Sequence, residues 1–448
     1  MNLKYQAKAL IDQKNYPEAL RILMDLLDDD PDDPQALFMF GSVAIHQNKR
    51  GLAYNIYARC AKIAPDNPSV WVNYGRCQED SPEGWKASEW CFMKALELDS
   101  QNVAAMSNLA ALNIQRCQIK DAKIWAKRCL KINPEYQVGL TSLAFAYLME
   151  GKWEKGWDHY RHMLGTTNRI DVQYGNLPLW EGQKGETVIV YGEQGIGDEI
   201  LYSSMLEDMA KDCTVIYDTM PRLEPLMKRS LPNVHVIGGR WDTDLVIPEG
   251  LTPTYRVPAA GVPCYYRNKR EDFPGKQYLT ADPDMRKSMR GLLDTLGTKP
   301  KIGVAWTGGS KGTRGHFRTQ DLESLTQLLR QDVEWVSLQY KDPSQEIAEY
   351  EENRGIKIHH FPWITEVKDY DLTAALVAEL DLVIAVPTSV TQLAGGLGQD
   401  AWVLVPEITG WLFYQNDYPW AKSLKLYHDW TAKQIGDDLS GWLKQKAA

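Results

Sequence analysis

The chain has 448 residues, which is more than one hydrophobic core usually organises, so we expect two to four domains. With 44% hydrophobic and 24% charged residues it can bury a substantial core, which excludes a mainly disordered chain. The formal net charge of −9 argues against broad binding to nucleic acids or anionic membranes, because both partners require clustered cations.

The N-terminal stretch MNLKYQAKALIDQ lacks the apolar core of a signal peptide, and no apolar run approaches the roughly 20 residues of a membrane span. We therefore expect a cytoplasmic protein with no membrane span. The seven cysteines include no CxxC pair, which favours reduced core thiols over a metal site or a disulfide framework.

Small residues recur every 34 or 35 positions through the first third of the chain, and a second series follows about twelve residues later. The first series is Ala7, Gly41, Gly75, Ala110 and Ala144; the second is Ala19, Ala53, Ser88, Ala122 and Gly156; the closing positions of the first four units are Pro31, Pro65, Ser100 and Pro134. This pattern resembles the tetratricopeptide repeat, in which small residues let two antiparallel helices approach closely.

Segments such as PEALRILMDLL and AKIWAKRCLKINP place apolar residues at helical spacing, so we expect an α solenoid over residues 1–165. Each repeat buries its apolar face only against its neighbours. Two roles stay open for the solenoid: a structural spacer, or a concave groove that holds a protein, a peptide or another copy of the chain.

The next segment, residues 166–185, is rich in Gly, Asn and Pro and is expected to be a linker. Short β-branched runs then alternate with helical stretches, which is typical of parallel α/β sheets. A first lobe, residues 186–290, is predicted with the strands TVIVYG, TVIYDT, VHVIGG and DLVIPE. A second lobe, residues 299–448, is predicted with the strands KIGVAWTG, VEWVSLQY, IKIHHF, LDLVIAVP, AWVLVPE and LKLYHD. Ligands of such sheets bind beyond the carboxyl ends of the strands.

The motifs that follow these strands occur in a definite order: PLWEG (178–182), GEQGIGDEI, IGVAWTGG with FRT, VSLQ, ALVAELDLVIAVPTSVTQLAGGLG and a final PW. In this order the chain resembles bacterial tetratricopeptide-repeat glycosyltransferases, whose catalytic part is similar to the heptosyltransferases of glycosyltransferase family 9. The resemblance covers essentially the whole chain. It implies a GT-B fold with two Rossmann-like lobes, the first on the acceptor side and the second on the nucleotide-sugar side. It also implies an inverting transfer, with the nucleotide sugar as donor substrate and no further cofactor. We expect a protein or saccharide acceptor that is positioned with the help of the repeats.

The first candidate site is the turn GEQGIGDE, residues 192–199. Gly195 and Gly197 allow a tight turn that brings backbone N–H groups near a ligand at a helix N-terminus. The turn is neither a full GxGxxG fingerprint nor a P-loop. The resemblance implies that Asp198 is the general base that accepts the proton of the acceptor hydroxyl, and the alternative is a helix cap. Glu193 is a second candidate base, or a residue that holds the turn.

The second candidate site is the loop WTGGSKGTRGHFRTQDLESL, residues 306–325. Its cations can neutralise a diphosphate, and its glycines allow close backbone approach. Charge stabilisation matters there because the nucleoside diphosphate leaves as an anion. The alternative is a solvated basic loop without a ligand. The donor-binding candidates are Thr307, Gly308, Lys311, Arg314 and Arg318, together with Gln339 of VSLQ and Trp363 after the strand IKIHHF as a platform for the base.

The third candidate site is AVPTSVTQLAGGLG, residues 385–398, where a strand enters a helix. Hydroxyls and free N–H groups at a helix N-terminus suit a phosphate. The donor-binding candidates are Thr388, Ser389, Val390, Thr391 and Gln392. The sequence departs from the family here, since Pro387 replaces the usual Asp and Gln392 the usual His.

These two departures keep a second hypothesis open, namely a catalytically inactive GT-B domain on a repeat scaffold for protein interaction. A nucleotide-sugar epimerase is a third and weaker alternative. No DxD motif stands at a suitable strand end, and Asp282 to Asp284 reads as a turn. The resemblance implies that no metal is needed, because GT-B enzymes generally work without one. The late aromatic residues are either stacking platforms or core: Trp411, Phe413, Tyr414, Tyr418 and Trp420.

Overall fold

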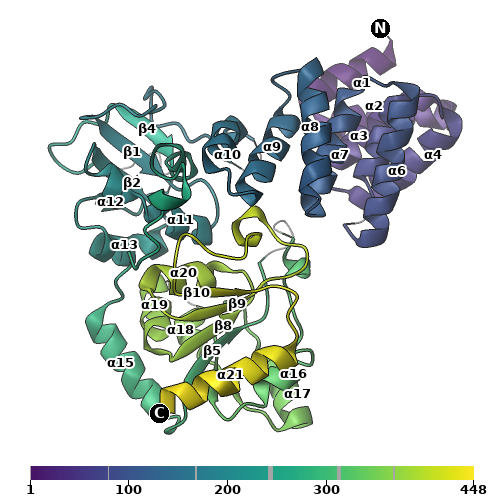
Figure 1. Cartoon of the computed structure of the whole chain (residues 1–448). Helices are drawn as coiled ribbons and strands as arrows, with labels where there is room; N and C mark the ends of the chain where they lie inside the picture. The colour runs from purple at the N-terminus through teal and green to yellow at the C-terminus, as the bar shows by residue number, and fades with distance from the viewer. Residues whose placement is uncertain are drawn as a thin grey trace. The chain divides into compact units, whose positions relative to one another are not determined.

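The structure, a computed structural model, describes residues 2–78, 80–166, 169–240, 246–309, 314–366 and 369–447. The chain divides into two compact units, Met1–Ala146 and Tyr147–Ala448 (Figure 1). Each unit is described by itself below.

The first unit consists of helices joined by short turns, and its first eight helices pack side by side in chain order, so that successive helices run antiparallel. The repeat-closing positions, such as Pro65 and Pro134, lie in the turns between successive pairs. The helices are α1 (Leu3–Asp12), α2 (Tyr16–Asp29), α3 (Pro34–His46), α4 (Arg50–Ile63), α5 (Pro68–Arg76), α6 (Pro82–Leu98), α7 (Val103–Gln115), α8 (Ile119–Ile132) and α9 (Gln137–Met149), the last of which crosses the boundary between the units.

The small residues of the repeat lie where paired helices approach most closely. A Cβ added to Gly41 would lie 2.8 Å from the ring of Tyr57, and one added to Gly75 would lie 2.6 Å from Phe92. Ala7 and Ala53 are completely buried. Larger side chains at these positions would force the helices apart, so the prediction of helix pairs of the tetratricopeptide type is confirmed.

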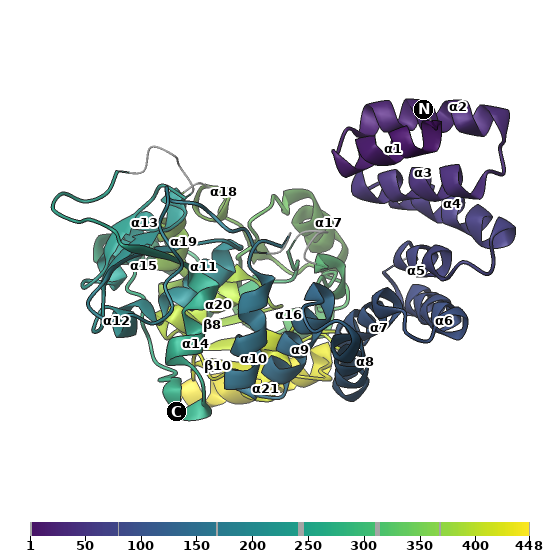
Figure 2. The ribbon, with the colours of Figure 1, turned by 90° about the horizontal axis from the view of Figure 1, so that it is seen from above.

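The second helix of the fifth repeat, α10 (Trp153–Tyr160), packs within the second unit. The indole Nε1 of Trp157 donates to the backbone oxygen of Arg267 at 2.7 Å, and the rings of Trp153 and Phe273 lie 4.9 Å apart. Figure 2 shows α10 in the neighbourhood of α14 (Pro263–Tyr266), against which it packs. The predicted end of the solenoid at residue 165 therefore lies beyond the packing boundary at Ala146.

The first sheet of the second unit has four parallel strands in the order β3-β2-β1-β4. Three of the four predicted runs form strands, but the run DLVIPE forms none in its described residues, 246–249. The run TYRVPA supplies the fourth strand instead, because it continues the sheet beside β1. The strands are β1 (Thr187–Tyr191), β2 (Thr214–Asp218), β3 (His235–Ile237) and β4 (Tyr255–Pro258).

The segment predicted as a linker packs on this first sheet. The backbone N–H of Trp180 donates to the oxygen of Arg256 at 2.9 Å, and Leu179 pairs with Arg256 as a parallel bridge. Trp180 and Arg169 are 3% and 1% exposed. Residues 169–180 therefore belong to the first lobe in packing terms.

The second sheet has six parallel strands in the order β10-β9-β8-β5-β6-β7, and all six predicted runs form them. Its core includes the fully buried indoles of Trp306 and Trp335. The strands are β5 (Lys301–Ala305), β6 (Glu334–Ser337), β7 (Ile358–His359), β8 (Leu382–Ala385), β9 (Ala401–Leu404) and β10 (Leu424–Tyr427).

Helices flank the two sheets, and α15 (Pro283–Asp294), which Asp282 caps, lies between the two lobes in the sequence. The other helices are α11 (Ile196–Ser203), α12 (Leu206–Met209), α13 (Glu224–Ser230), α16 (Thr326–Leu329), α17 (Ser344–Arg354), α18 (Pro362–Thr365), α19 (Tyr370–Glu379), α20 (Ser389–Leu397) and α21 (Ala432–Ala447). Short 3-10 turns include η2 (Pro221–Leu223), η6 (Gly315–Phe317) and η7 (Trp411–Phe413). The two lobes touch where α11 packs on α20 and α13 on α19.

All seven cysteines are free thiols and five of them are buried, as predicted for core residues. Within the part of the chain that the structure describes, no helix combines the length and the apolar character needed to cross a bilayer.

Candidate functional site

A cavity of about 540 Å³ lies between the two lobes of the second unit. The first lobe contributes the turn before α11 and the 3-10 turn η2, which follow strands β1 and β2. The second lobe contributes the loops after β5, β6, β8 and β9. The cavity therefore lies at the carboxyl ends of parallel strands, where such sheets bind ligands.

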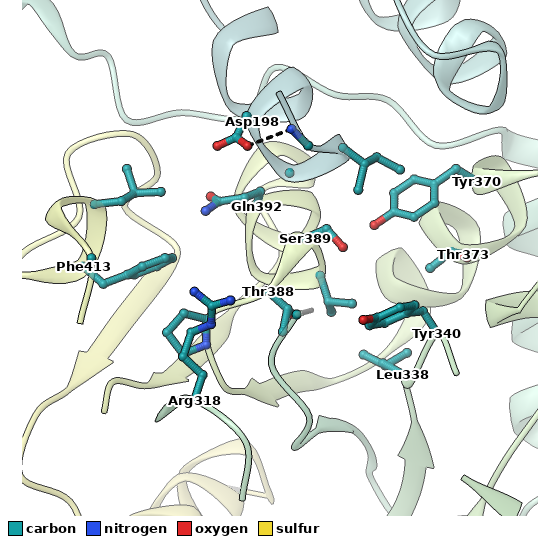
Figure 3. Close-up of a pocket in the computed structure, with 18 of the residues that line it drawn as sticks. Asp198, Arg318, Leu338, Tyr340, Tyr370, Thr373, Thr388, Ser389, Gln392 and Phe413 are labelled. Carbon is teal, nitrogen blue, oxygen red and sulfur yellow. Dashed lines mark hydrogen bonds between the residues drawn. The ribbon is translucent and has the colours of Figure 1, made fainter. Parts of the chain in front are cut away.

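The first turns of α11 and α20 form one wall of the cavity. A Cβ added to Gly197 would lie 3.3 Å from Ser389 Cα and 3.5 Å from the Gln392 side chain. The bare glycine thus lets the two helix N-termini approach closely. Both termini face the same cavity (Figure 3), so their N–H groups and dipoles favour an anionic ligand there.

Asp198 lies on this wall in the first turn of α11. Its Oδ2 accepts a hydrogen bond from the backbone N–H of Gly195 at 3.0 Å, so the side chain closes the helix N-terminus. Asp198 also lines the cavity. Burial raises its pKa to about 6, against the opposing effects of the Gly195 hydrogen bond and of Arg318. A carboxylate with this pKa is a stronger base than an exposed aspartate, yet it is ionised at pH 7, which suits a general base.

Arg318 faces the cavity from the second lobe (Figure 3). A Cβ added to Gly308 would lie 2.5 Å from Arg318 Cβ, so the bare glycine makes room for the arginine. Arg318 Nη2 donates weakly to the Gly308 oxygen at 3.4 Å. Burial, and then the charge of Arg314, lower the pKa of Arg318, while Tyr340 and Asp198 oppose the shift. A partly desolvated guanidinium of this kind stabilises a bound phosphate.

The N-terminus of α20 brings four predicted donor-site residues to the cavity: Thr388, Ser389, Val390 and Gln392. Thr388 is the N-cap residue, but its hydroxyl makes no capping hydrogen bond. Thr391 is fully buried, and its hydroxyl donates to the Thr388 oxygen at 2.6 Å, so it supports the turn. Gln392 Oε1 accepts from the Tyr418 hydroxyl. Pro387 also lines the cavity.

The cavity holds several polar atoms that are buried without a hydrogen-bond partner. These include Arg222 Nε, Thr365 Oγ1 and Thr388 Oγ1. Each such atom costs free energy unless a ligand or water satisfies it. Their concentration in one cavity indicates a binding site for a polar ligand.

Several predicted site residues do not line this cavity. Glu193 is 4% exposed and accepts from Arg169 Nη2 at 3.0 Å, so it holds the turn through a buried ion pair. Thr307 and Gln339 bond to each other and border a separate recess of about 70 Å³. Trp363 is 51% exposed.

Only some of the predicted residues in the basic loop of the second site line the cavity. Arg314 lies outside the cavity lining, with its guanidinium carbon 4.5 Å from the ring centroid of Phe317. Gly309 lines the cavity in place of Gly308. Lys311 falls outside the described residues. Of the late aromatic residues, Trp411 and Phe413 line the cavity, whereas Tyr414, Tyr418 and Trp420 do not.

Five further polar residues line the cavity and were not predicted from the sequence: Arg222, Tyr340, Thr365, Tyr370 and Thr373. Tyr340 and Thr365 follow strands β6 and β7, so the rule for strand ends could have found them. Arg222 belongs to a short turn after β2 and carries no motif. Only the structure shows that Arg222 reaches the cavity, where its guanidinium carbon lies 4.9 Å from the centroid of the Tyr370 ring.

Three side chains of types that bind metal ions lie close together outside the cavity lining. The candidate ligand atoms of Asp342, His360 and Glu366 lie within 4.8 Å of one another. His360 Nε2 is 2.7 Å from Glu366 Oε1, so a hydrogen bond already accounts for the closest contact.

No family model matches the chain. The chain is 25% identical over 431 residues to Protein FlbA of Caulobacter vibrioides, an alignment that spans 89% of this chain and 70% of that protein.

Among solved structures, the first unit is similar to PilW, a widely conserved type IV pilus biogenesis factor. The identity is 20%, the TM-score 0.33, and the match covers 36% of this chain and 74% of PilW. MamA matches with 14% identity and a TM-score of 0.31 over 35% of this chain and 91% of MamA. YrrB, a TPR protein with an unusual peptide-binding site, matches with 14% identity and a TM-score of 0.30 over 36% of this chain and 82% of YrrB.

Proposed function

We propose that this chain is a glycosyltransferase of the GT-B type, which transfers a sugar from a nucleotide donor to a hydroxyl of a protein or saccharide acceptor. The observation that carries the proposal is the meeting of Asp198, Arg318 and the α20 N-terminus in one cavity. A base can activate the acceptor hydroxyl, and a cation and a helix N-terminus can stabilise the departing phosphate.

Each of these groups has one role in the proposed mechanism. Asp198 accepts the proton of the acceptor hydroxyl, because an alcohol is a poor nucleophile at neutral pH. Arg318 and the N–H groups of α20 stabilise the negative charge that develops on the departing phosphate. The unpartnered hydroxyl of Thr388 lies beside these N–H groups and can donate to a phosphate oxygen. No step requires a metal ion.

A thermal-shift screen against UDP, ADP, GDP, CMP and their common sugar conjugates tests the donor site. We expect one nucleotide to stabilise the wild type, by about 2.7 kcal/mol at a hundredfold excess over Kd. Arg318→Ala should abolish the shift, while Arg354→Ala, which removes an exposed arginine paired with Glu323, should retain it. A wild type that no nucleotide stabilises would contradict the proposal.

The alternative is an inactive GT-B domain on a repeat scaffold, and two observations favour it. The first is the pair of departures at Pro387 and Gln392, since Gln392 is already engaged by Tyr418. The second is a groove of about 380 Å³ in the first unit, where Asn73 and Asn108 occupy equivalent positions of successive repeats. Carboxamides repeated in this way suit the main chain of an extended peptide. Peptide binding without any nucleotide response would favour this alternative.

A further inference from the structure

The cavity has two chemically different ends (Figure 3). Asp198, Gln392, Phe413 and Arg318 lie on one side of the α20 N-terminus. On the other side lie the residues that follow strands β6 and β7 or begin α19: Leu338, Tyr340, Tyr370 and Thr373. The proposed glycosyl transfer uses only the first end and the helix N-terminus between the two.

Arg222 of the first lobe belongs to the second end, because η2 packs against α19 and the guanidinium carbon lies 4.9 Å from the Tyr370 ring centroid. Its Nε is buried and has no hydrogen-bond partner. Within the described ranges, Arg222 also forms no ion pair with a carboxylate. The second end therefore holds a positive charge that no described acidic side chain neutralises.

Two hydroxyl-bearing residues belong to the same end: Tyr370, and Thr365, whose neighbour Ile364 accepts a hydrogen bond from the Thr373 hydroxyl at 2.8 Å. Thr365 and Tyr370 are each 5% exposed, and both line the cavity. Thr365 Oγ1 has no hydrogen-bond partner, and Tyr370 Oη interacts with the Ser389 side chain without a hydrogen bond of ordinary geometry. The helices that carry them, α18 and α19, pack on each other, and this packing fixes the positions of the two residues.

The chemistry of these three groups selects the kind of ligand. A guanidinium can only donate hydrogen bonds, and a hydroxyl can donate one. A neutral sugar hydroxyl would satisfy the donors but leave the charge of Arg222 uncompensated in a partly buried site. An oxyanion accepts from all three groups and also neutralises the charge.

We propose that Arg222, Thr365 and Tyr370 form a second oxyanion subsite, separate from Arg318, which takes a carboxylate or a phosphate monoester. The assignment of this subsite to a sugar substrate rests on the proposed glycosyltransferase function. The substrates then include an acidic group besides the nucleotide phosphates, either on the sugar that is transferred or on the acceptor.

Binding of simple anionic sugars to the full chain tests the subsite without requiring turnover. The probes are glucose 6-phosphate and glucuronate, with glucose as the neutral match, titrated against the wild type, Arg222→Gln, Thr365→Val and Arg318→Gln. We expect the charged sugars to bind the wild type at least tenfold more tightly than glucose. Arg222→Gln should remove this preference, Thr365→Val should weaken it several-fold, and Arg318→Gln should retain it.

The proposal is overturned if the wild type binds the charged sugars no more tightly than glucose. It is also overturned if Arg318→Gln removes the preference and Arg222→Gln does not. Because Thr365→Val changes no charge and little volume, it keeps the test valid even if Arg222→Gln misfolds.

Two further titrations identify the source of the anion. A preference for UDP-glucuronate over UDP-glucose that requires Arg222 assigns the subsite to the donor sugar. Binding of glucose 6-phosphate on top of saturating UDP assigns it to the acceptor. If no nucleotide binds but binding of glucose 6-phosphate still depends on Arg222, the proposed glycosyl transfer is wrong and the subsite is supported. If nucleotides bind but Arg222→Gln leaves the binding of both anionic sugars unchanged, only the subsite is wrong.

Discussion

Asp198 occupies a position in the first turn of a helix, where a carboxylate usually acts as a cap with a low pKa. In this chain the cap also faces the cavity, and burial raises its pKa to about 6. The capping role and the proposed catalytic role thus belong to the same side chain. The two roles differ in how they depend on pH.

The raised pKa predicts opposite effects of Asp198→Asn on stability and on turnover. The folded pKa of about 6 exceeds the unfolded value of about 3.9, so the ionised carboxylate destabilises the fold as the pH rises through 6. The asparagine variant can still accept from Gly195 but carries no charge. It should therefore be more stable than the wild type at pH 8, by about 1–3 kcal/mol, with no difference near pH 3. Denaturant unfolding at both pH values measures this.

Turnover should respond in the other direction. The wild-type rate should fall as the pH drops below about 6, because a protonated carboxyl cannot accept the acceptor's proton, and Asp198→Asn should be inactive at every pH. Asp282→Asn is the matched control, since Asp282 caps α15 and backbone hydrogen bonds lower its pKa. That variant should gain no stability at pH 8. If the Asp198→Asn variant is less stable than the wild type and still active, Asp198 serves only as a helix cap and not as the base.

At the scale of elements, the contact between α11 and α20 fixes the geometry of the cavity. Gly197 faces Ser389 of α20 at a distance that leaves no room for a methyl group in ordinary contact. From sequence, Gly197 was expected to allow a tight turn. The structure adds a second role for this glycine, because its missing side chain permits close packing between the lobes.

A pair of glycine-to-alanine changes separates this packing role from helix propensity. Gly197→Ala places a Cβ 3.3 Å from Ser389 Cα, so the helices must shift, whereas a Cβ on Gly291 of α15 meets nothing within 4 Å. Gly291→Ala should gain about 0.5–1 kcal/mol from helix propensity. Gly197→Ala should be about 1–3 kcal/mol less stable than Gly291→Ala, because of overpacking, and should lose any nucleotide-induced shift. Equal stabilities of the two variants in denaturant would contradict this account.

Element prediction succeeded where the signal was local. The repeat spacing and the six strand runs of the second sheet were confirmed because periodicity is a property of neighbouring residues. The fourth strand of the first sheet was misplaced, because DLVIPE and TYRVPA are both short apolar runs. Within the described residues only TYRVPA pairs with β1, and this decides which run becomes a strand. The pairing joins residues far apart in the chain, so local sequence does not reveal it.

At the scale of the whole molecule, the packing boundary differs from the repeat boundary. By sequence, α10 is the second helix of the fifth repeat. By packing, it belongs to the second unit, where Trp157 contacts Trp411 at 5.6 Å between ring centroids. Trp411 in turn lines the cavity. The last repeat helix therefore supports a wall of the candidate site.

Two fragments test this boundary. The fragment 137–448 keeps α9 and α10 whole, and it should unfold cooperatively. The fragment 166–448, cut at the predicted end of the solenoid, loses Trp153 and Trp157 and uncovers the aromatic side chains that they bury, so we expect it to aggregate or to melt at a clearly lower temperature. Calorimetry and light scattering measure both outcomes. Equal melting temperatures would show that α10 contributes nothing to the second unit.

The sequence by itself determined the helical repeats, the six strands of the second sheet and the strand ends where a ligand could bind. These features depend on residue spacing, which is local. Only the tertiary structure decided which candidate residues meet. It placed Asp198 and Arg318 in one cavity and buried Glu193 against Arg169. It also brought Arg222 to Tyr370, because parallel sheets gather the ends of strands that are distant in sequence.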